Sequence, residues 1–219
     1  LVLSAGVCTA FLAGDLFTLY VFVEVASIAS YGLVAYRTGG TEVEAAFKYL
    51  VLGTLASTGI LLGITVLYAA TGFLNLADLA GAIAAGAVPP VALAFASGLF
   101  VLGFATKTAA MPFHAWLPDA HPSAPAPISA MLSGLLIKTL GIYALVRVFY
   151  VVVGMDEQVR LILTALGCLS MWGGVLLAQA QDDLKRILAF HSVSQMGYVL
   201  IALGLGTWLG VAAALFHAV

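Results

Sequence analysis

Three ionisable side chains lie inside long apolar stretches of the sequence: Glu24, Lys107 and Lys138. A charged side chain at the centre of a membrane-spanning helix costs about 2.5–3.5 kcal/mol, so the three together cost on the order of 8–10 kcal/mol. Burial favours the neutral form of a lysine, and a nearby carboxylate favours the charged form. A Glu–Lys contact that forms and breaks can therefore switch a buried lysine between holding and releasing a proton. These residues predict a proton relay.

Structural ion pairs are the alternative interpretation. Buried pairs could orient helices, and the Lys107 amine could reach the membrane surface on its flexible stem. Lys138 lies too deep to reach the surface easily, and Glu24 is the one acidic residue at similar depth. The relay therefore accounts for the three residues together better than the structural alternative does.

Four histidines extend the set of polar residues. Histidine titrates near neutral pH and can pass protons on through water. His114 and His121 flank a proline-rich segment, whereas His191 and His217 lie in later apolar runs. His191 fits a relay residue and a packed polar residue equally well, and the context of His217 is open. His114, Asp119 and His121 match no zinc spacing, so no metal site is expected.

Five of the seven prolines lie within 112–127: Pro112, Pro118, Pro122, Pro125 and Pro127. Proline removes a backbone donor and clashes with the preceding turn, so the helix that starts near Val91 is predicted to break close to Met111. A broken backbone at membrane depth persists only where protein or water satisfies it. We therefore expect a polar entry path at this break, formed by Pro112, His114, Pro118, Asp119 and His121.

The composition requires a membrane around these residues. The 219 residues are 63% apolar and 8% charged, whereas an ordinary soluble domain is about 25% charged. A hydrocarbon core of about 30 Å needs about 20 helical residues, and continuous apolar runs favour helices over a barrel. The predicted fold is all-α, a polytopic transmembrane helix bundle with a proline-broken helix. Its apolar runs are 1–13, 15–36, 47–71, 91–111, 128–150, 158–180, 186–205 and 207–219.

Short connections join these runs, so 1–219 is predicted to be a single transmembrane domain. The first and last runs have about half the length of a span, and they indicate a segment truncated at both ends. Loop charges give the orientation, because lysine and arginine favour the cytoplasmic side. One side carries Arg37, Lys48, Lys185 and Arg186, and the other carries Arg147 and Arg160.

Several functional classes are excluded by what the sequence lacks. Eight basic residues and a net charge of −2 leave no stripe for nucleic acid. Cys8 and Cys168 stand in apolar stretches without a CxxC motif, and we expect two small buried residues and neither a disulfide nor an iron–sulfur site. Motifs for nucleotide or haem are absent, so no cofactor, electron carrier or conventional catalytic residue is predicted.

Three segments of the sequence resemble a known family. They are GDLFTLYVFVEVASIASYGLVAY (14–36), FATKTAAMPFHAWLPDAHPSAPAPISAMLSGLLIKTLGIYALVR (104–147) and QDDLKRILAFHSVSQMGYVLIALG (181–204). In this order they resemble the antiporter-like membrane subunits shared by respiratory complex I, the Mrp sodium/proton antiporters and the energy-converting hydrogenases. The resemblance covers nearly the whole chain.

The resemblance implies a fold of about fourteen helices built from two inverted repeats, each with a broken helix. By this similarity the chain corresponds to about helices four to eleven, with 1–150 as the first repeat and 158–219 as part of the second. Glu24, Lys107 and Lys138 match the family's proton-relay residues, and His217 matches a later relay position. The residue that completes the exit half-channel in the family lies beyond Val219.

The function expected from this resemblance is that of a proton-translocating membrane subunit without a redox centre of its own. Its partners are then other membrane subunits, protons and the lipid bilayer, in a prokaryotic inner membrane with the Arg37 and Lys185 side in the cytoplasm. Two alternatives remain open. One is an Mrp-type antiporter subunit in which Asp15 and Glu24 contact sodium, and the other is a non-conducting scaffold.

Overall fold

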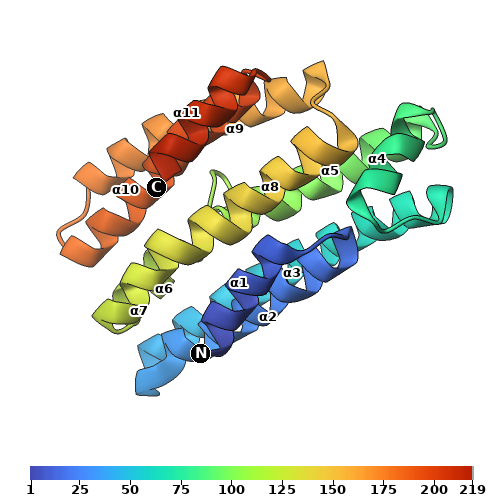
Figure 1. Ribbon diagram of the computed structural model, residues 1–219. Coiled ribbons are helices and arrows are strands. Elements are labelled where there is room, and N and C mark those ends of the chain that lie inside the picture. The colour runs from blue at the N-terminus through green and yellow to red at the C-terminus, as the bar shows by residue number, and fades with distance from the viewer. Residues whose placement is uncertain (219) are drawn as a thin grey trace.

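The computed structural model describes residues 1–218, except the side chains of residues 138 and 139. Regular structure in this part of the chain is helical (Figure 1). The elements are α1 (Val2–Leu12), α2 (Leu16–Val34), η1 (Ala35–Arg37), α3 (Gly40–Thr71), α4 (Leu76–Ala84), α5 (Pro90–Lys107), α6 (Leu117–Ser123), α7 (Ala126–Met131), η2 (Leu132–Tyr143), α8 (Ala144–Val146), η3 (Arg147–Val153), α9 (Glu157–Gln179), α10 (Leu184–Gly204) and α11 (Trp208–Ala218).

Six helices within the described part of the chain are long and apolar enough to cross a membrane. One of them is the continuous helix Ala126–Val153, in which η2 and η3 have π-type winding. The predicted all-α polytopic fold is thereby confirmed. The start of α3 differs from the prediction, because the helix begins at Gly40 instead of 47. The segment between the predicted runs 47–71 and 91–111 also contains the short helix α4.

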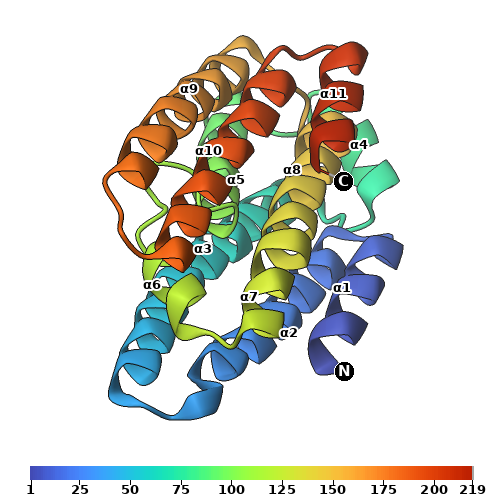
Figure 2. The same cartoon turned by 90° about the vertical axis from the view of Figure 1, so that its left-hand side faces the viewer.

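The chain passes from one side of the bundle to the other in sequence order (Figures 1 and 2). Both views place α1–α3 (blue to cyan) and α9–α11 (orange to red) on either side of the yellow helix that contains α7 and α8. Within this arrangement α2 packs against α3, α3 against α5, and α9 against α10. The helix Ala126–Val153 therefore contacts elements of both sides.

Aspartate and asparagine side chains fix where four of the helices begin. Asp15 caps α2, Asn75 caps α4, Asp156 caps α9 and Asp183 caps α10, each by accepting a hydrogen bond from a backbone N–H of the first turn. Such caps satisfy donors that a helix start otherwise leaves unpaired. These short polar residues therefore set the starts of three spans and of the short helix α4.

Glycines allow α3 and α5 to pack closely. A Cβ on Gly63 would lie 2.9 Å from the Phe100 ring, and a Cβ on Gly103 would lie 2.9 Å from the Ala56 carbonyl oxygen. Between lipid-embedded helices, association depends on such close packing, because lipid is as apolar as the side chains. This contact holds α5, and thus Lys107 at its end, firmly against α3.

The helical break begins immediately after Lys107, four residues before the predicted position near Met111. Residues 108–116 connect α5 to the short helix α6, which contains Pro122. Protein groups satisfy the open backbone at this point: the Met111 N–H donates to Ser170 Oγ at 2.8 Å, and Trp116 Nε1 donates to the Thr106 carbonyl at 2.9 Å. Helix α5 therefore ends at Lys107, before the first of these prolines. The prolines that follow prevent a long helix from forming again directly after the break.

The two cysteines are placed differently from the prediction. Cys8 and Cys168 are both exposed on the surface of the bundle rather than buried in it. Apolar neighbours in the sequence did not distinguish a buried position from one that faces lipid, because lipid is as apolar as the protein core.

Candidate functional site

Lys107 and Glu24 meet inside the bundle, as the sequence predicted for an acid and an amine kept in apolar spans. The Lys107 side chain is 6% exposed and the Glu24 side chain 19% exposed. Lys107 Nζ lies 3.3 Å from Glu24 Oε2 and donates a shorter hydrogen bond, of 2.8 Å, to Ser27 Oγ. The amine therefore has one charged and one neutral partner, both on α2.

A third helix completes the surroundings of Glu24. The Ser57 hydroxyl, on α3, donates to the same carboxylate oxygen that Lys107 contacts. Breaking a buried ion pair by removing one partner leaves an uncompensated charge and costs about 3–5 kcal/mol. Together with Ser57, the Glu24–Lys107 pair thus links α2, α3 and α5. Each charge has a partner, so neither is left uncompensated inside the bundle.

Hydroxyl groups next to this pair are functional candidates that the sequence reasoning missed. Ser27, Ser30 and Tyr31 follow Glu24 at helical spacings, and this spacing is the signal that could have identified them. Ser30 Oγ lies 2.6 Å from the Ser27 carbonyl oxygen and 3.0 Å from the Tyr49 hydroxyl on α3. The polar surroundings of Lys107 therefore extend along the contact between α2 and α3.

Trp116 anchors the connection after the break. Its ring stacks on Tyr49, with centroids 4.1 Å apart and an angle of 8° between the planes. Its Nε1 donates to the carbonyl of Thr106, the residue before Lys107. Trp116 is fully buried, so it joins the broken segment to α3 and fills space beside the end of α5.

His121 is a buried member of the predicted entry path. Its Nδ1 is hydrogen-bonded to the Ser129 hydroxyl, and its Nε2 has no hydrogen-bond partner among the described residues. Burial is the main cause that lowers the pKa of His121 below its usual value, and the positive charge of Lys185 is the second cause. His121 is therefore neutral at neutral pH. Lys185 is held close by, where its Nζ donates to the Pro122 and Ala124 carbonyls at 3.1 and 2.7 Å.

His114 occupies the connection itself. Its Nδ1 is buried without a partner in the described part of the chain, and its ring lies 6.0 Å from that of Phe190 on α10. Burial lowers the pKa of His114 as well. His114 and His121 therefore share the broken segment, but each has its own separate set of contacts.

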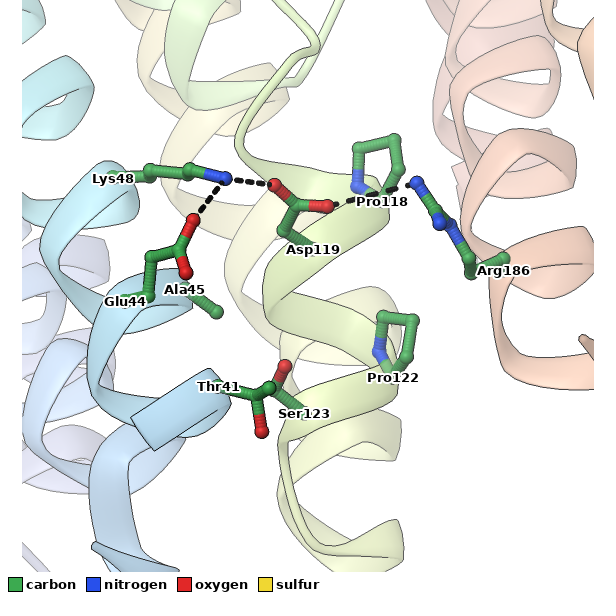
Figure 3. Close-up of a pocket in the computed structure, with 9 residues that line it drawn as sticks. All are labelled: Thr41, Glu44, Ala45, Lys48, Pro118, Asp119, Pro122, Ser123 and Arg186. Atoms are coloured by element: carbon green, nitrogen blue, oxygen red, sulfur yellow. Dashed lines mark hydrogen bonds and ion pairs between the residues drawn. The ribbon is translucent and has the colours of Figure 1, made fainter. Parts of the chain in front are cut away.

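Asp119 lies at the outer edge of the broken segment, in a charged cluster with residues of α3 and α10 (Figure 3). Its carboxylate oxygens lie 2.9 Å from Lys48 Nζ and 3.7 Å from Arg186 Nη2, and Lys48 also pairs with Glu44 at 2.9 Å. Figure 3 shows Pro118 beside this cluster. A polar cavity of about 220 Å³ opens here, whereas Pro112 is exposed elsewhere on the connection.

The structure brings His191 and His217 together through a residue between them. His217 Nε2 lies 2.7 Å from Gln195 Oε1, and Gln195 Nε2 lies 3.4 Å from His191 Nε2. Beside them is a cavity of about 190 Å³, where Ser133 of η2 is hydrogen-bonded to Ser192 of α10. This bridging role of Gln195 was not predicted.

Lys138 lies in η2, and its side chain is outside the part of the structure that is described. The helix that carries it packs against α2 and α5, which hold the Glu24–Lys107 pair, and also against α10, which holds His191. The helix η2 therefore contacts both the elements that hold the Glu24–Lys107 pair and the element that holds His191.

Within residues 1–218, no three His, Cys, Asp or Glu side chains are arranged to hold a metal ion.

The fold and the site together define a polytopic α-helical membrane protein with an acid–amine pair between its spans. The chain belongs to the NADH:quinone oxidoreductase/Mrp antiporter transmembrane family, whose pattern matches residues 13–219. The resemblance drawn from the three sequence segments is thereby confirmed, and the chain is integral to the membrane.

Individual relatives come from two kinds of complex. The chain is 40% identical to an NADH-quinone oxidoreductase subunit of Desulforudis audaxviator, over 99% of this chain and 43% of that protein. It is also 40% identical to a Na(+)/H(+) antiporter subunit of Alkalihalophilus pseudofirmus, over 98% of this chain and 43% of that protein. The chain thus spans about two fifths of the length of these relatives.

Solved structures show the same fold. A chain of the Mrp complex from Dietzia sp. matches 99% of this chain with a TM-score of 0.90 and 36% identity, over 40% of its own length. A chain of the membrane-bound sulfane sulfur reductase, an archaeal respiratory membrane complex, matches 99% with a TM-score of 0.92 and 36% identity, over 44% of its length.

Proposed function

We propose that this chain is the proton-translocating part of an antiporter-like membrane subunit in a respiratory or related energy-converting complex. The observation that carries the proposal is the contact between Lys107 and Glu24, buried among α2, α3 and α5. A charge in apolar surroundings is costly, and this pair has the two residue types that can exchange and store a proton there.

The proposed relay has three stages along the bundle. Separation of Glu24 from Lys107 removes the carboxylate that favours the charged amine, and Lys107 then releases its proton. Lys138 on η2 receives it, and the group of His191, Gln195 and His217 passes it on toward the remainder of the protein. Protons enter from the cytoplasmic side, which we assign to the Arg37 and Lys185 end from the loop charges.

The proposed partners follow from the relatives. These are named as subunits of NADH-quinone oxidoreductases and of Na(+)/H(+) antiporters, or are found in multi-subunit membrane complexes. We propose that other membrane subunits of such a complex, in a prokaryotic inner membrane, surround this chain and supply the driving force.

Sodium/proton exchange is the second candidate, because the antiporter relative is as similar as the NADH-quinone oxidoreductase relative. The two carboxylates considered for sodium do not form one site, however. Asp15 caps the start of α2, and its Oδ1 accepts from the Thr18 N–H. Glu24 lies nine residues further on, about 13 Å along the helix axis. A sodium site would therefore have to use Glu24 with other oxygen ligands.

The test uses the full-length protein in its complex, reconstituted in vesicles with a pH-sensitive dye. Lys107→Ala and Lys138→Ala are expected to reduce proton flux nearly to background, and unchanged flux in Lys138→Ala contradicts the relay. Flux that requires sodium and is absent with potassium favours the antiporter candidate. A scaffold role predicts instead that Lys138→Met is neutral or stabilising, as replacement of buried charges by apolar residues often is.

A further inference from the structure

Two polar stripes face each other across the contact between α2 and α3. On α2, Glu24, Ser27 and Tyr31 follow at steps of three and four residues and share one face. On α3, Tyr49, Gly53 and Ser57 follow at steps of four. The helices run in opposite directions from the turn between them, so Glu24 meets Ser57 and Tyr31 meets Gly53. We call this set the α2–α3 seam: Glu24, Ser27, Ser30, Tyr31, Tyr49, Gly53 and Ser57.

The Tyr31 hydroxyl is the unexplained group in the seam. The residue is 4% exposed, yet its hydroxyl has no hydrogen-bond partner among the described residues. Gly53 makes room for it, because a Cβ at this position would collide with the Tyr31 oxygen. An unpaired buried hydroxyl costs about 1–3 kcal/mol, and buried water commonly supplies the missing partner. The hydroxyl therefore points to a water molecule inside the seam.

The seam reaches from the buried pair toward the surface. At its inner end, Lys107 Nζ donates to Ser27 Oγ. At its outer end, the Tyr49 hydroxyl is bonded to Ser30, and the Tyr49 ring meets that of Tyr31 edge-on at 4.5 Å. One turn before Tyr49 on α3 is Ala45, which lines the polar cavity beside Lys48 and Asp119 (Figure 3).

By contrast, large side chains pack beside the end of α5 where the broken segment joins α6. Trp116 is fully buried, stacks on Tyr49 and is bonded to the carbonyl of Thr106, next to Lys107. Leu117 follows it and is also fully buried. At this point Trp116 and Leu117 place large apolar surfaces, and no titratable group of their own, beside the end of α5.

We propose that protons reach the Glu24–Lys107 pair through the α2–α3 seam, with the Tyr31 hydroxyl holding the water that connects Tyr49 to Ser27. This proposal rests on the proposed function, proton translocation. In the transfer, a hydronium ion on the Tyr49 side gives its excess proton to the Tyr31 oxygen and becomes neutral water, as the Tyr31 O–H proton passes through water to neutral Lys107. The phenol ends as it began, one proton has moved inward, and no electrons are exchanged.

Tyr31→Phe tests the proposal, because it removes the hydroxyl and keeps the ring. In the reconstituted complex, this variant is expected to lower proton flux about tenfold or more, as loss of a positioned proton-transfer group does. Tyr68→Phe is the matched control, since Tyr68 lies exposed near the far end of α3, and its flux is expected to equal that of the unmodified complex.

The same preparations distinguish a failure of the seam from a failure of the proposed function. If Tyr31→Phe carries full flux while Lys107→Ala carries none, the seam is overturned and the proposed function stands. If Lys107→Ala also carries full flux, the proposed function itself fails. A second readout is independent of flux: high-resolution density for the complex is expected to show water within hydrogen-bond distance of the Tyr31 oxygen, and a dry seam overturns the proposal.

Discussion

Lys107 Nζ lies closer to the Ser27 hydroxyl, at 2.8 Å, than to the Glu24 carboxylate, at 3.3 Å. The hydroxyl is a neutral partner that accepts from a charged amine. Separation from Glu24 therefore leaves the amine with one hydrogen bond in place. Loss of the carboxylate then makes the protonated amine less favourable but moves the amine little. This asymmetry suits a group that must gain and lose a proton without moving far.

Removing the charge of Glu24 is expected to slow the relay. Glu24→Gln keeps an oxygen that can accept from Ser57 but removes the attraction that favours protonated Lys107, which is roughly 4 kcal/mol at about 4 Å and an effective dielectric constant of about 20. Proton flux in vesicles is expected to fall about tenfold or more, with the complex still assembled. Glu157→Gln, on the exposed first turn of α9, is the control, and equal flux in both variants contradicts the role of Glu24.

Removing the neutral partner is expected to have a smaller effect. Ser27→Ala leaves Lys107 with Glu24 alone, so the amine loses the hydrogen bond that persists when the pair opens. Flux is expected to fall several-fold. Ser97→Ala is a matched control on α5, because Ser97 is buried and, among the described residues, its hydroxyl bonds the carbonyl of Leu93 on its own helix. A larger loss in Ser97→Ala than in Ser27→Ala refutes the positioning role.

The stability of the complex is expected to fall in acid because of His121. Its pKa is lower in the folded protein than the value of about 6.5 in an unfolded chain. The unfolded state therefore binds the proton more readily, and the stabilising contribution is full above pH 6.5 and is lost as the pH falls toward the folded pKa. Thermal unfolding from pH 8 to pH 5 measures this loss.

Lys185→Gln provides the control for that measurement. Glutamine can still donate to the Pro122 and Ala124 carbonyls, but it removes the charge that is the second cause of the lowered pKa. The decrease in unfolding temperature between neutral and acidic pH is expected to become smaller. An identical decrease shows that burial alone sets the pKa of His121.

The bridge between two histidines gives a further test of the relay. Gln195→Leu keeps the size of the side chain and removes both contacts, those with His191 and His217. Proton flux is expected to fall several-fold if these groups pass protons on. Gln181→Leu is the control, since the Gln181 side chain bonds the carbonyl of Leu177 and no histidine within the part of the chain that the structure describes. Full flux in Gln195→Leu would instead assign the three residues to packing.

The spans and the broken helix could be predicted because each depends on local sequence. Apolar runs identify the spans through the thickness of the bilayer, and the cluster of prolines identifies the break. The pairing of Glu24 with Lys107 could also be predicted, because neither charge is tolerable alone. The start of α3 at Gly40 was less accessible, since polar residues such as Glu42 and Glu44 continue the helix beyond the apolar run.

The contacts of the hydroxyl groups were not predictable to the same degree. Serine in a membrane helix commonly bonds its own backbone, as Ser97 does. Whether it also faces a lysine on another helix depends on how α2, α3 and α5 pack against one another. Glycines such as Gly53 and Gly103 allow the close helix contacts on which that packing depends. The two-repeat organisation, with 1–150 and 158–219 as its parts, stays a prediction, as does the role of Lys138.

Neighbouring residues at the start of α10 hold the proline-rich segment from two sides. Lys185 binds the carbonyls of Pro122 and Ala124, and Arg186 pairs with Asp119. Two hydrogen bonds and one ion pair thus join the first turn of α10 to the segment that contains the short helix α6. A displacement of the start of α10 therefore strains three contacts of the proline-rich segment at once, so α6 and α10 are expected to shift as one unit.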